Sequence, residues 1–252
     1  MKKSNRMLEL TQPEVEKELK EHGVVIIPTG SVEQHGPHLP LGTDYYAIEA
    51  IAERVADKMG GLLVPFPHVG VTPFHMSFAG SITFSQETFM QVFKDICDSL
   101  IKHNANKIIV VNWHEGNTGA INTICARLQV EYPNVIFIIS QACYIAEKLY
   151  SDVGLNHGGA LEVLPVQGYR PELVHLDRAT NPSPKDRAKK MDALRRRREA
   201  YPIIPDIRIM YPTGWYGDLE ICTPENAEIF LEKVSDHVVA SVQETLKEME
   251  MI

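Results

Sequence analysis

The feature that most constrains this 252-residue chain is a set of short, uninterrupted apolar runs rich in β-branched residues. Such runs are typical of strands covered on both faces, because a strand with one face in water alternates apolar with polar residues. Stretches of helical length separate the runs, and this alternation predicts βαβ units with a parallel sheet. We expect strands at residues 24–28, 62–66, 107–111 and 135–140.

Five helices are expected around this sheet. Thr11 and Glu14 have capping-box spacing, with Pro13 in the first turn, which marks the start of the first helix. Thr223 is a suitable N-cap for a long last helix. The predicted fold class is α/β, a three-layer α/β/α sandwich with a mostly parallel central sheet, in one domain over residues 1–252. The expected helices cover residues 13–22, 44–59, 86–103, 118–132 and 224–249.

Composition excludes several classes of protein. Apolar residues make up 44% and charged residues 23%, which are globular values. A net charge of −8 disfavours nucleic-acid binding by bulk electrostatics. No apolar run is long enough to span a membrane, and no apolar segment of a secretory signal follows the start. Without a C-x-x-C pair, we expect reduced thiols and a cytoplasmic protein; the cysteines are Cys97, Cys125, Cys143 and Cys222.

The first chemically suggestive motif follows the first expected strand. Glu33 and His35 are two residues apart, so in extended backbone their side chains point to the same side and could begin a metal site. Asp44 returns after a loop rich in glycine and proline, where a helix N-cap is the alternative interpretation. His38 is interpreted as a solvated loop histidine, with metal ligation as the alternative.

A second motif, residues 112–117, follows the third expected strand. His114-Glu115 invites comparison with the zinc-protease pattern H-E-x-x-H, but Thr118 stands where that pattern needs its second histidine. A lone histidine at a strand end is more often structural than a ligand. Two strand ends that both deliver metal-binding groups favour a shared site, because ligands collect at the carboxyl ends of strands in open α/β sheets.

Two further segments carry weaker signals. His157 and Glu162 are five residues apart, so they share a site only if a turn lies between them. His75 could contact a substrate, or it could be a loop histidine bonded to backbone. Residues 185–199 hold eight basic and three acidic side chains. We interpret this basic segment as a solvated helix face, with a subunit contact or an anion site as alternatives.

Taken together, these motifs resemble the creatininase (creatinine amidohydrolase) family. The resemblance implies a three-layer α/β/α sandwich that carries two metal ions and opens cyclic amides or removes formyl groups. It also implies a homo-oligomer, commonly a hexamer. The matching segments are residues 30–44, 75–83, 112–117 and 157–162, with 214–218 similar to a late glycine segment of the family.

The resemblance also implies roles for individual residues. One metal would be held by Glu33, Asp44 and His114, and the second by His35, Asp44 and Glu162, so that Asp44 bridges them. This donor set suits Zn²⁺ or Mn²⁺, with Fe²⁺ also possible. A hydroxide shared by the metals would attack the carbonyl. His157 would be the catalytic histidine. Substrate-binding candidates are His75, Ser77 and Glu115.

The expected substrate is a small cyclic amide or formamide. One alternative is a deformylase of a formylamino-pyrimidine phosphate in flavin or deazaflavin biosynthesis, and another is a peptidase-like relative. A non-catalytic binding protein on the same fold is the alternative from a different class. The sequence departs from creatininase itself at Gly116, where that enzyme has a glutamate, and the acid here is Glu115 instead.

Overall fold

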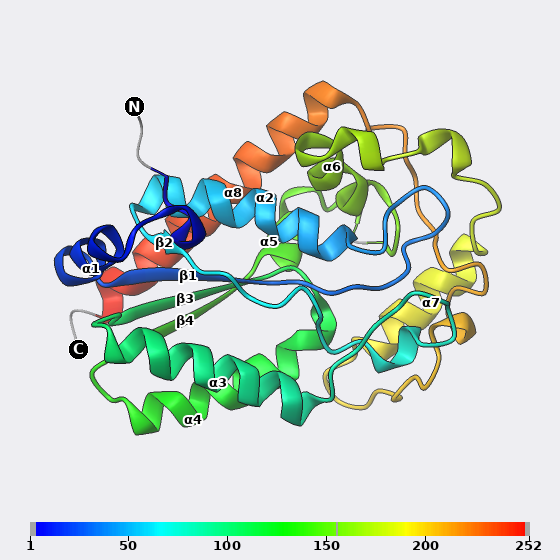
Figure 1. Cartoon of the computed structure of the whole chain (residues 1–252). Helices are drawn as coiled ribbons and strands as arrows, with labels where there is room; N and C mark the ends of the chain where they lie inside the picture. The colour runs from blue at the N-terminus through cyan, green and yellow to red at the C-terminus, as the bar shows by residue number, and fades with distance from the viewer. Residues whose placement is uncertain (1–3, 155, 250–252) are drawn as a thin grey trace.

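Four parallel strands form the centre of the computed structural model, which describes residues 4–154 and 156–249 (Figure 1). Strands β1, β3 and β4 have six residues each, whereas β2 has two. The order across the sheet is β2-β1-β3-β4. The predicted α/β fold class is confirmed. The strands are β1 (Val24–Thr29), β2 (Leu62–Leu63), β3 (Lys107–Asn112) and β4 (Ile136–Gln141).

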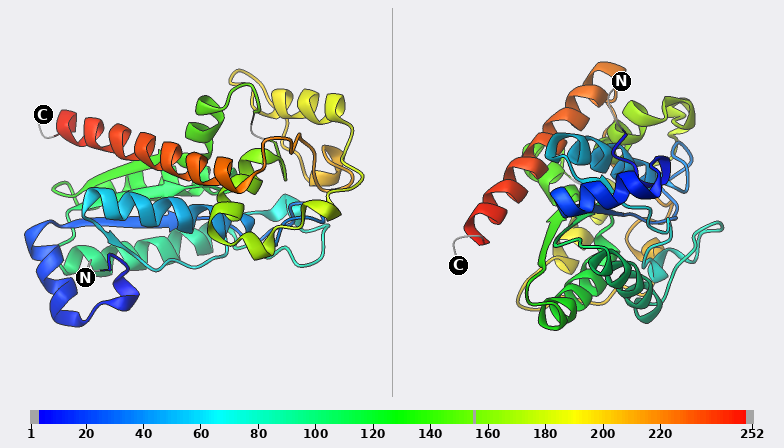
Figure 2. Two further views of the ribbon diagram at one scale, coloured as in Figure 1. Left: turned by 90° about the horizontal axis from the view of Figure 1, so that it is seen from above. Right: turned by 60° about the vertical axis from the view of Figure 1, so that its left-hand side comes forward.

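Helices cover both faces of this sheet (Figures 1 and 2). One face packs against α2 (Thr43–Met59), α5 (Ala142–Leu149), α6 (Ala160–Tyr169) and α8 (Pro224–Met249). The other packs against α1 (Gln12–Glu21), α3 (Gln86–Lys102) and α4 (Thr118–Glu131). Helix α7 (Lys185–Arg195) lies away from both layers, beyond the carboxyl ends of the strands. Short 3₁₀ helices are η1 (Met7–Glu9), η2 (Pro73–His75), η3 (Glu115–Asn117), η4 (Pro171–Leu173), η5 (Leu176–Arg178) and η6 (Ile207–Ile209).

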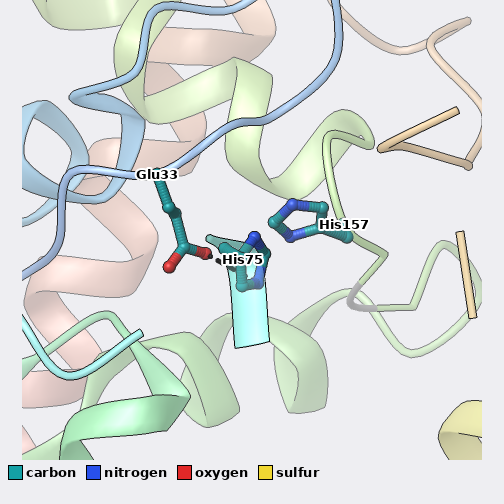
Figure 3. Close-up of side chains that lie close together, drawn as sticks. All are labelled: Glu33, His75 and His157. Carbon is teal, nitrogen blue, oxygen red and sulfur yellow. Dashed lines mark ion pairs between the residues drawn. The ribbon is translucent and has the colours of Figure 1, made fainter. Parts of the chain in front are cut away.

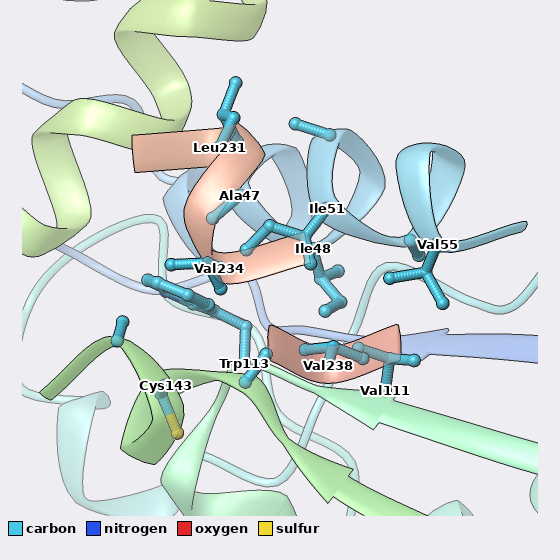
Figure 4. Packing of buried hydrophobic residues seen from close by; sticks show 14 of the residues in the cluster. Ala47, Ile48, Ile51, Val55, Val111, Trp113, Cys143, Leu231, Val234 and Val238 are labelled. Atoms are coloured by element: carbon cyan, nitrogen blue, oxygen red, sulfur yellow. The ribbon is translucent and has the colours of Figure 1, made fainter. Parts of the chain in front are cut away.

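The long helix α8 shows how the sequence produces this packing. One face of this helix is apolar, because apolar residues follow one another at intervals of three or four. Phe230 and Leu231 are followed at this spacing by Val234 and then Val238, and all four are fully buried. This face meets α2 and Trp113 in the core of one layer (Figure 4). Each such side chain contributes about 1.5–3 kcal/mol of burial free energy, so the helix is held mainly by packing.

One local prediction and one alternative interpretation need correction. The strand expected at 62–66 ends at Leu63, because Pro65 has no N–H to continue a sheet ladder. Asp44 is not an N-cap: Gly42 occupies that position and Asp44 lies inside the first turn of α2, buried. The capping box of Thr11 and Glu14 is confirmed.

Other expectations concern the chain as a whole. All four cysteines are buried free thiols, as expected for reduced cysteines. Across the described ranges, no helix combines the length and apolarity that a membrane crossing requires.

The connections leave β1 and β3 towards opposite faces of the sheet. After β1 the chain enters α2 on one face, and after β3 it enters α4 on the other. The two strands are neighbours in full register, from Val24 opposite Lys107 to Thr29 opposite Asn112, so their carboxyl ends stop level. Such a switch point leaves a crevice, which is where open α/β sheets bind ligands.

Candidate metal centre

Five buried ligand-type side chains converge at this crevice. The loop after β1 supplies Glu33 and His35, and the first turn of α2 supplies Asp44. The end of β3 supplies His114. Glu162 comes from the first turn of α6, and the turn that the sequence required lies at Gly158, whose φ is +72°. The structure thus brings together all five residues to which metal ligation was assigned.

Asp44 stands between the two histidines. Its Oδ2 lies 2.9 Å from Nδ1 of His114, and its Oδ1 lies 3.3 Å from Nε2 of His35. The Ser31 hydroxyl donates to Oδ2 over 2.7 Å and fixes the carboxylate. Each oxygen of Asp44 therefore faces a different imidazole, which is the arrangement that a bridging carboxylate needs.

The glutamates lie on opposite sides of this arrangement. Glu33 Oε2 is 3.5 Å from Nε2 of His114, and Glu162 Oε2 is 3.5 Å from Nε2 of His35. The Gly158 amide donates to the same Glu162 oxygen over 2.5 Å. Glu33 Oε1 also lies 3.9 Å from Nε2 of His35, so ligand atoms of Glu33, His35 and Asp44 lie within 4.8 Å of one another.

Backbone carbonyls orient both imidazoles. Nδ1 of His35 lies 3.1 Å from the Glu33 carbonyl, and Nε2 of His114 lies 3.1 Å from the Val71 carbonyl. A carbonyl can only accept, so these nitrogens carry the proton in the neutral rings. The opposite nitrogens, Nε2 of His35 and Nδ1 of His114, then present their lone pairs towards Asp44. Metal-binding histidines are commonly held in this way.

Burial and close opposite charges shift the pKa values of all five side chains. Burial raises the pKa of Glu33, and it raises that of Glu162 to about 8. Burial acts on Asp44 in the same direction, but the adjacent imidazoles of His35 and His114 outweigh it and hold the Asp44 pKa well below its ordinary value. The carboxylates in turn outweigh burial at the imidazoles and raise their pKa values, to about 10 for His35 and about 9 for His114.

The donor set fits divalent cations. Three carboxylates and two imidazoles suit Zn²⁺, Mn²⁺ or Fe²⁺. Glu33 Oε2 and His35 Nε2 are buried, and neither has a hydrogen-bond partner. Buried polar groups are rarely left unpaired, so these two atoms indicate a cation as the missing partner.

Two more histidines stand beside the cluster (Figure 3). His75 Nε2 lies 3.4 Å from Glu33 Oε1, and His157 Nδ1 lies 4.0 Å from Glu162 Oε2. Burial lowers the pKa of both rings, which keeps them neutral. Ligand atoms of Glu33, His75 and His157 also lie within 4.8 Å of one another, so these three form a further group able to hold a cation.

Gln34 links these two histidines, and sequence reasoning missed it. The Gly36 amide donates to its Oε1 over 3.2 Å, which fixes the orientation of the side-chain amide. Its Nε2 then lies 2.9 Å from Nε2 of His157 and 3.5 Å from Nδ1 of His75. Its backbone carbonyl lies 2.7 Å from the same His157 nitrogen. The sequence feature that could have identified Gln34 as a site residue is its position between Glu33 and His35.

A cavity of about 180 Å³ opens onto the cluster. Of the proposed substrate-binding residues, His75 and Glu115 line it. Ser77 is not among the lining residues, and its hydroxyl donates to Asp206 over 2.8 Å. The outer wall includes Asp192, Arg195 and Arg196 of the basic segment at 185–199, together with Ile207 and Tyr211.

Glu115 is tied to the basic segment. Its Oε2 accepts hydrogen bonds from Arg195 over 2.7 Å and from Arg196 over 3.3 Å, and Tyr144 donates to its Oε1 over 2.9 Å. Burial alone would raise its pKa, but the two guanidinium groups outweigh burial and lower the pKa to about 2. Glu115 is therefore a carboxylate at neutral pH. The adjacent Gly116 has no room for a side chain, because a Cβ there would lie 2.3 Å from the Val71 carbonyl.

His38 corrects one expectation. It is completely buried rather than solvated, and its Nε2 lies 2.8 Å from the carbonyl of Gly158, which can only accept. Its ring meets Trp215 edge to face at 4.6 Å. His38 thus holds the turn between His157 and Glu162 in place.

Relatives with known names match most of the chain. It is 31% identical over 224 residues to the mycofactocin precursor peptide peptidase of Mycobacterium ulcerans, covering 85% of this chain and 82% of that protein. It is 26% identical over 181 residues to creatinine amidohydrolase of Pseudomonas putida, covering 64% and 70%. It is 24% identical over 260 residues to 3-dehydro-scyllo-inosose hydrolase of Thermotoga maritima, covering 94% and 82%.

Solved structures show the same fold. A manganese creatininase superposes with a TM-score of 0.79 at 22% identity, covering 96% of this chain and 99% of that one. A mutant creatininase of Zn-Zn type superposes with a TM-score of 0.80 at 23% identity, covering 96% and 98%. The family model described as creatinine amidohydrolase matches residues 8–242. The chain therefore belongs to the creatininase family of hydrolases.

Proposed function

We propose that this chain is a metal-dependent hydrolase that cleaves the C–N bond of an amide at a two-metal centre. Glu33, Asp44 and His114 would hold one cation, and His35, Asp44 and Glu162 the other. The observation that carries this proposal is Asp44, whose two oxygens face two different imidazoles. The solved creatininases described as manganese and Zn-Zn forms support Mn²⁺ and Zn²⁺ as the ions.

The chemistry divides between the cations and the chain. Two bound divalent cations lower the pKa of a water and polarise a carbonyl oxygen. His157 supplies proton transfer, because its neutral ring reaches the cavity beside Glu162. The backbone carbonyl of Gln34 accepts from the far nitrogen of that ring, Nε2. Phe74, Trp113 and Tyr211 contribute apolar surface that excludes bulk water from the cavity.

The substrate class has two candidates. The cavity of about 180 Å³ favours a small cyclic amide or formamide. The peptidase relative is named for a precursor peptide and matches 85% of this chain, which favours a peptide amide. A peptide would have to present only its reacting end, since the cavity is too small for more.

The first test is metal content per chain, measured by elemental mass spectrometry. We expect about two ions in the wild type and a large loss in Asp44→Ala. Asp236→Ala is the matched control, because Asp236 is an exposed partner of Lys58 far along α8. A wild type that holds no metal, or an Asp44→Ala variant that keeps all of it, would contradict the two-metal proposal.

The second test is hydrolysis of a panel containing creatinine, N-formyl compounds and short peptides. We expect at least one class to be cleaved, with loss of turnover on chelation and recovery on adding Mn²⁺ or Zn²⁺. A protein that holds two ions but hydrolyses nothing in the panel would favour the non-catalytic binding protein.

A further inference from the structure

Asp192 is a buried carboxylate on α7 and one of the three acidic residues of the basic segment at 185–199. It is 8% exposed and lines the cavity. Tyr211 donates its hydroxyl to Oδ2 over 2.6 Å, and Tyr216 donates to the same oxygen. Arg195 donates from Nε to Oδ1 over 2.9 Å. Three donors satisfy both oxygens, so Asp192 has one fixed orientation.

Both tyrosines also contact His157. The Tyr211 ring lies nearly parallel to the imidazole, at 11° with the ring centroids 5.7 Å apart. The Tyr216 backbone amide donates to the His157 carbonyl over 2.9 Å. Tyr211 therefore restricts the position of the His157 ring, and Tyr216 restricts its backbone. Both tyrosine hydroxyls donate to Asp192.

Asp192 is also connected, through Arg195, to the segment that carries the candidate ligand His114. Arg195 holds Asp192 through Nε and Glu115 through Nη2, and Glu115 follows His114 directly. Part of the basic segment at 185–199 is thus a wall of the cavity rather than only a solvated helix face. The network spans the site from the candidate metal ligands to the histidine assigned to proton transfer.

We propose that Asp192 is a positioning residue that fixes the His157 imidazole through Tyr211 and Tyr216. The proposal rests on the proposed role of His157. A proton-transferring ring must keep its reactive nitrogen aimed at the reacting atoms, and displacement by about 1 Å can cost up to about 100-fold in rate. Ala188 and Met191 of α7 pack in the same apolar cluster as Tyr211 and Tyr216, but Asp192 is the α7 side chain that accepts hydrogen bonds from both tyrosines.

The competing explanation is that Asp192 only anchors α7. Lys185 anchors the same helix through an ion pair with Asp218, at its other end and away from the cavity. Lys185→Gln is therefore the matched control: it weakens the attachment of α7 and leaves the hydrogen bonds of Asp192 to Tyr211 and Tyr216 in place.

The first measurement is independent of activity. Ring ¹⁵N chemical shifts of His157 would be recorded by NMR in metal-loaded protein with labelled histidine, and assigned by their loss in His157→Gln. We expect Asp192→Asn to move or broaden these signals and Lys185→Gln to leave them unchanged. Unchanged His157 signals in Asp192→Asn would overturn the proposal, even if the wild type hydrolyses nothing in the panel.

The second measurement separates kcat from KM with the best substrate of the panel. We expect Asp192→Asn to lower kcat about 10- to 100-fold with KM within about threefold and metal content unchanged. Tyr211→Phe, which keeps the ring and removes one donor, should show a smaller loss; it replaces Asp192→Asn if that variant does not fold. An equal loss of kcat in Lys185→Gln would show that Asp192 is only an anchor.

Discussion

Replacing Glu115 with glutamine removes the negative charge that two partly buried guanidinium groups, of Arg195 and Arg196, share. Arg195 and Arg196 both donate to Glu115 Oε2, and the Glu115 side chain is 28% exposed. Glutamine has the same shape but no charge, so the two guanidinium groups would keep a weaker acceptor. We expect Glu115→Gln to fold and to be less stable than the wild type at neutral pH.

The magnitude follows from the pKa of Glu115. The guanidinium groups outweigh burial and lower it from 4.5 to about 2. A difference of about 2.5 pKa units corresponds to about 3.4 kcal/mol between the charged and neutral forms. Partial exposure screens this interaction, so we expect Glu115→Gln to lower the free energy of unfolding by about 2 kcal/mol. For a chain of this size, that is a decrease in Tm on the order of 4–8 °C.

The pH dependence gives the sharper test. The folded pKa of Glu115 is depressed, so its contribution is present above the unfolded pKa of 4.5 and is lost as pH falls towards 2. The stability difference between wild type and variant should be constant from pH 7 to about 5.5 and smaller by about 0.8 kcal/mol, roughly two fifths of it, at pH 4. Urea denaturation of both metal-saturated proteins across this range measures it, and other titrations cancel in the difference.

The control is Glu172→Gln. Glu172 pairs with Arg170 on the surface, where both side chains are about half exposed, and such pairs contribute roughly 0–1 kcal/mol. A Glu115→Gln protein as stable as the wild type at pH 7 would refute the reasoning. So would a stability difference that stays the same at pH 4.

Three further outcomes are expected. Ser31→Ala removes the hydrogen bond to Asp44 and should weaken metal binding about 10- to 100-fold, measured by competition with a chromophoric chelator; unchanged affinity would contradict the bridging geometry. In Gly158→Ala the new residue must adopt a φ of +72° with its Cβ 2.8 Å from the His35 carbonyl. We therefore expect the free energy of unfolding, measured by urea denaturation, to fall by about 2–4 kcal/mol. The control is Gly119→Ala, which has open space at Cβ and should not be destabilised. Chelation should lower Tm by on the order of 5–10 °C, because the cations bind only the folded site; an unchanged Tm would count against a resident metal.

The parts of this molecule that could be predicted from sequence are those whose causes are local. Continuous apolar runs identified the strands of the sheet, and a parallel sheet brings the strand ends together. Glu33 and His35 after β1 and His114 after β3 therefore had to lie near one another. The N-cap interpretation of Asp44 failed because helix propensity describes one element, whereas Asp44 also faces the next strand end. The burial of His38 was missed for the same reason.

The outer wall of the cavity could not be predicted, because its contacts join segments far apart in sequence. Asp192 and Tyr211 meet across 19 residues, and Glu115 and Arg195 across 80. Neither pair has a spacing that any regular element would impose. From sequence alone, a run of arginines is best interpreted as a solvent-exposed helix face. Only the fold shows that Arg195 and Arg196 both donate to the carboxylate of Glu115.

The metal-ligand cluster and the outer wall of the cavity therefore differ in how well a sequence predicts them. The inner half of the site lies on strand ends and helix starts, where a one-residue shift would turn each ligand away from the others. The outer half lies on α7 and η6, which lie outside the layered core. Residues of both elements line the cavity, and the matched relatives are named for a peptide, creatinine and a dehydro-inosose. The family of hydrolases can therefore be inferred from motifs on the inner half, whereas the shape of the outer half depends on how α7 meets Glu115 and Tyr211.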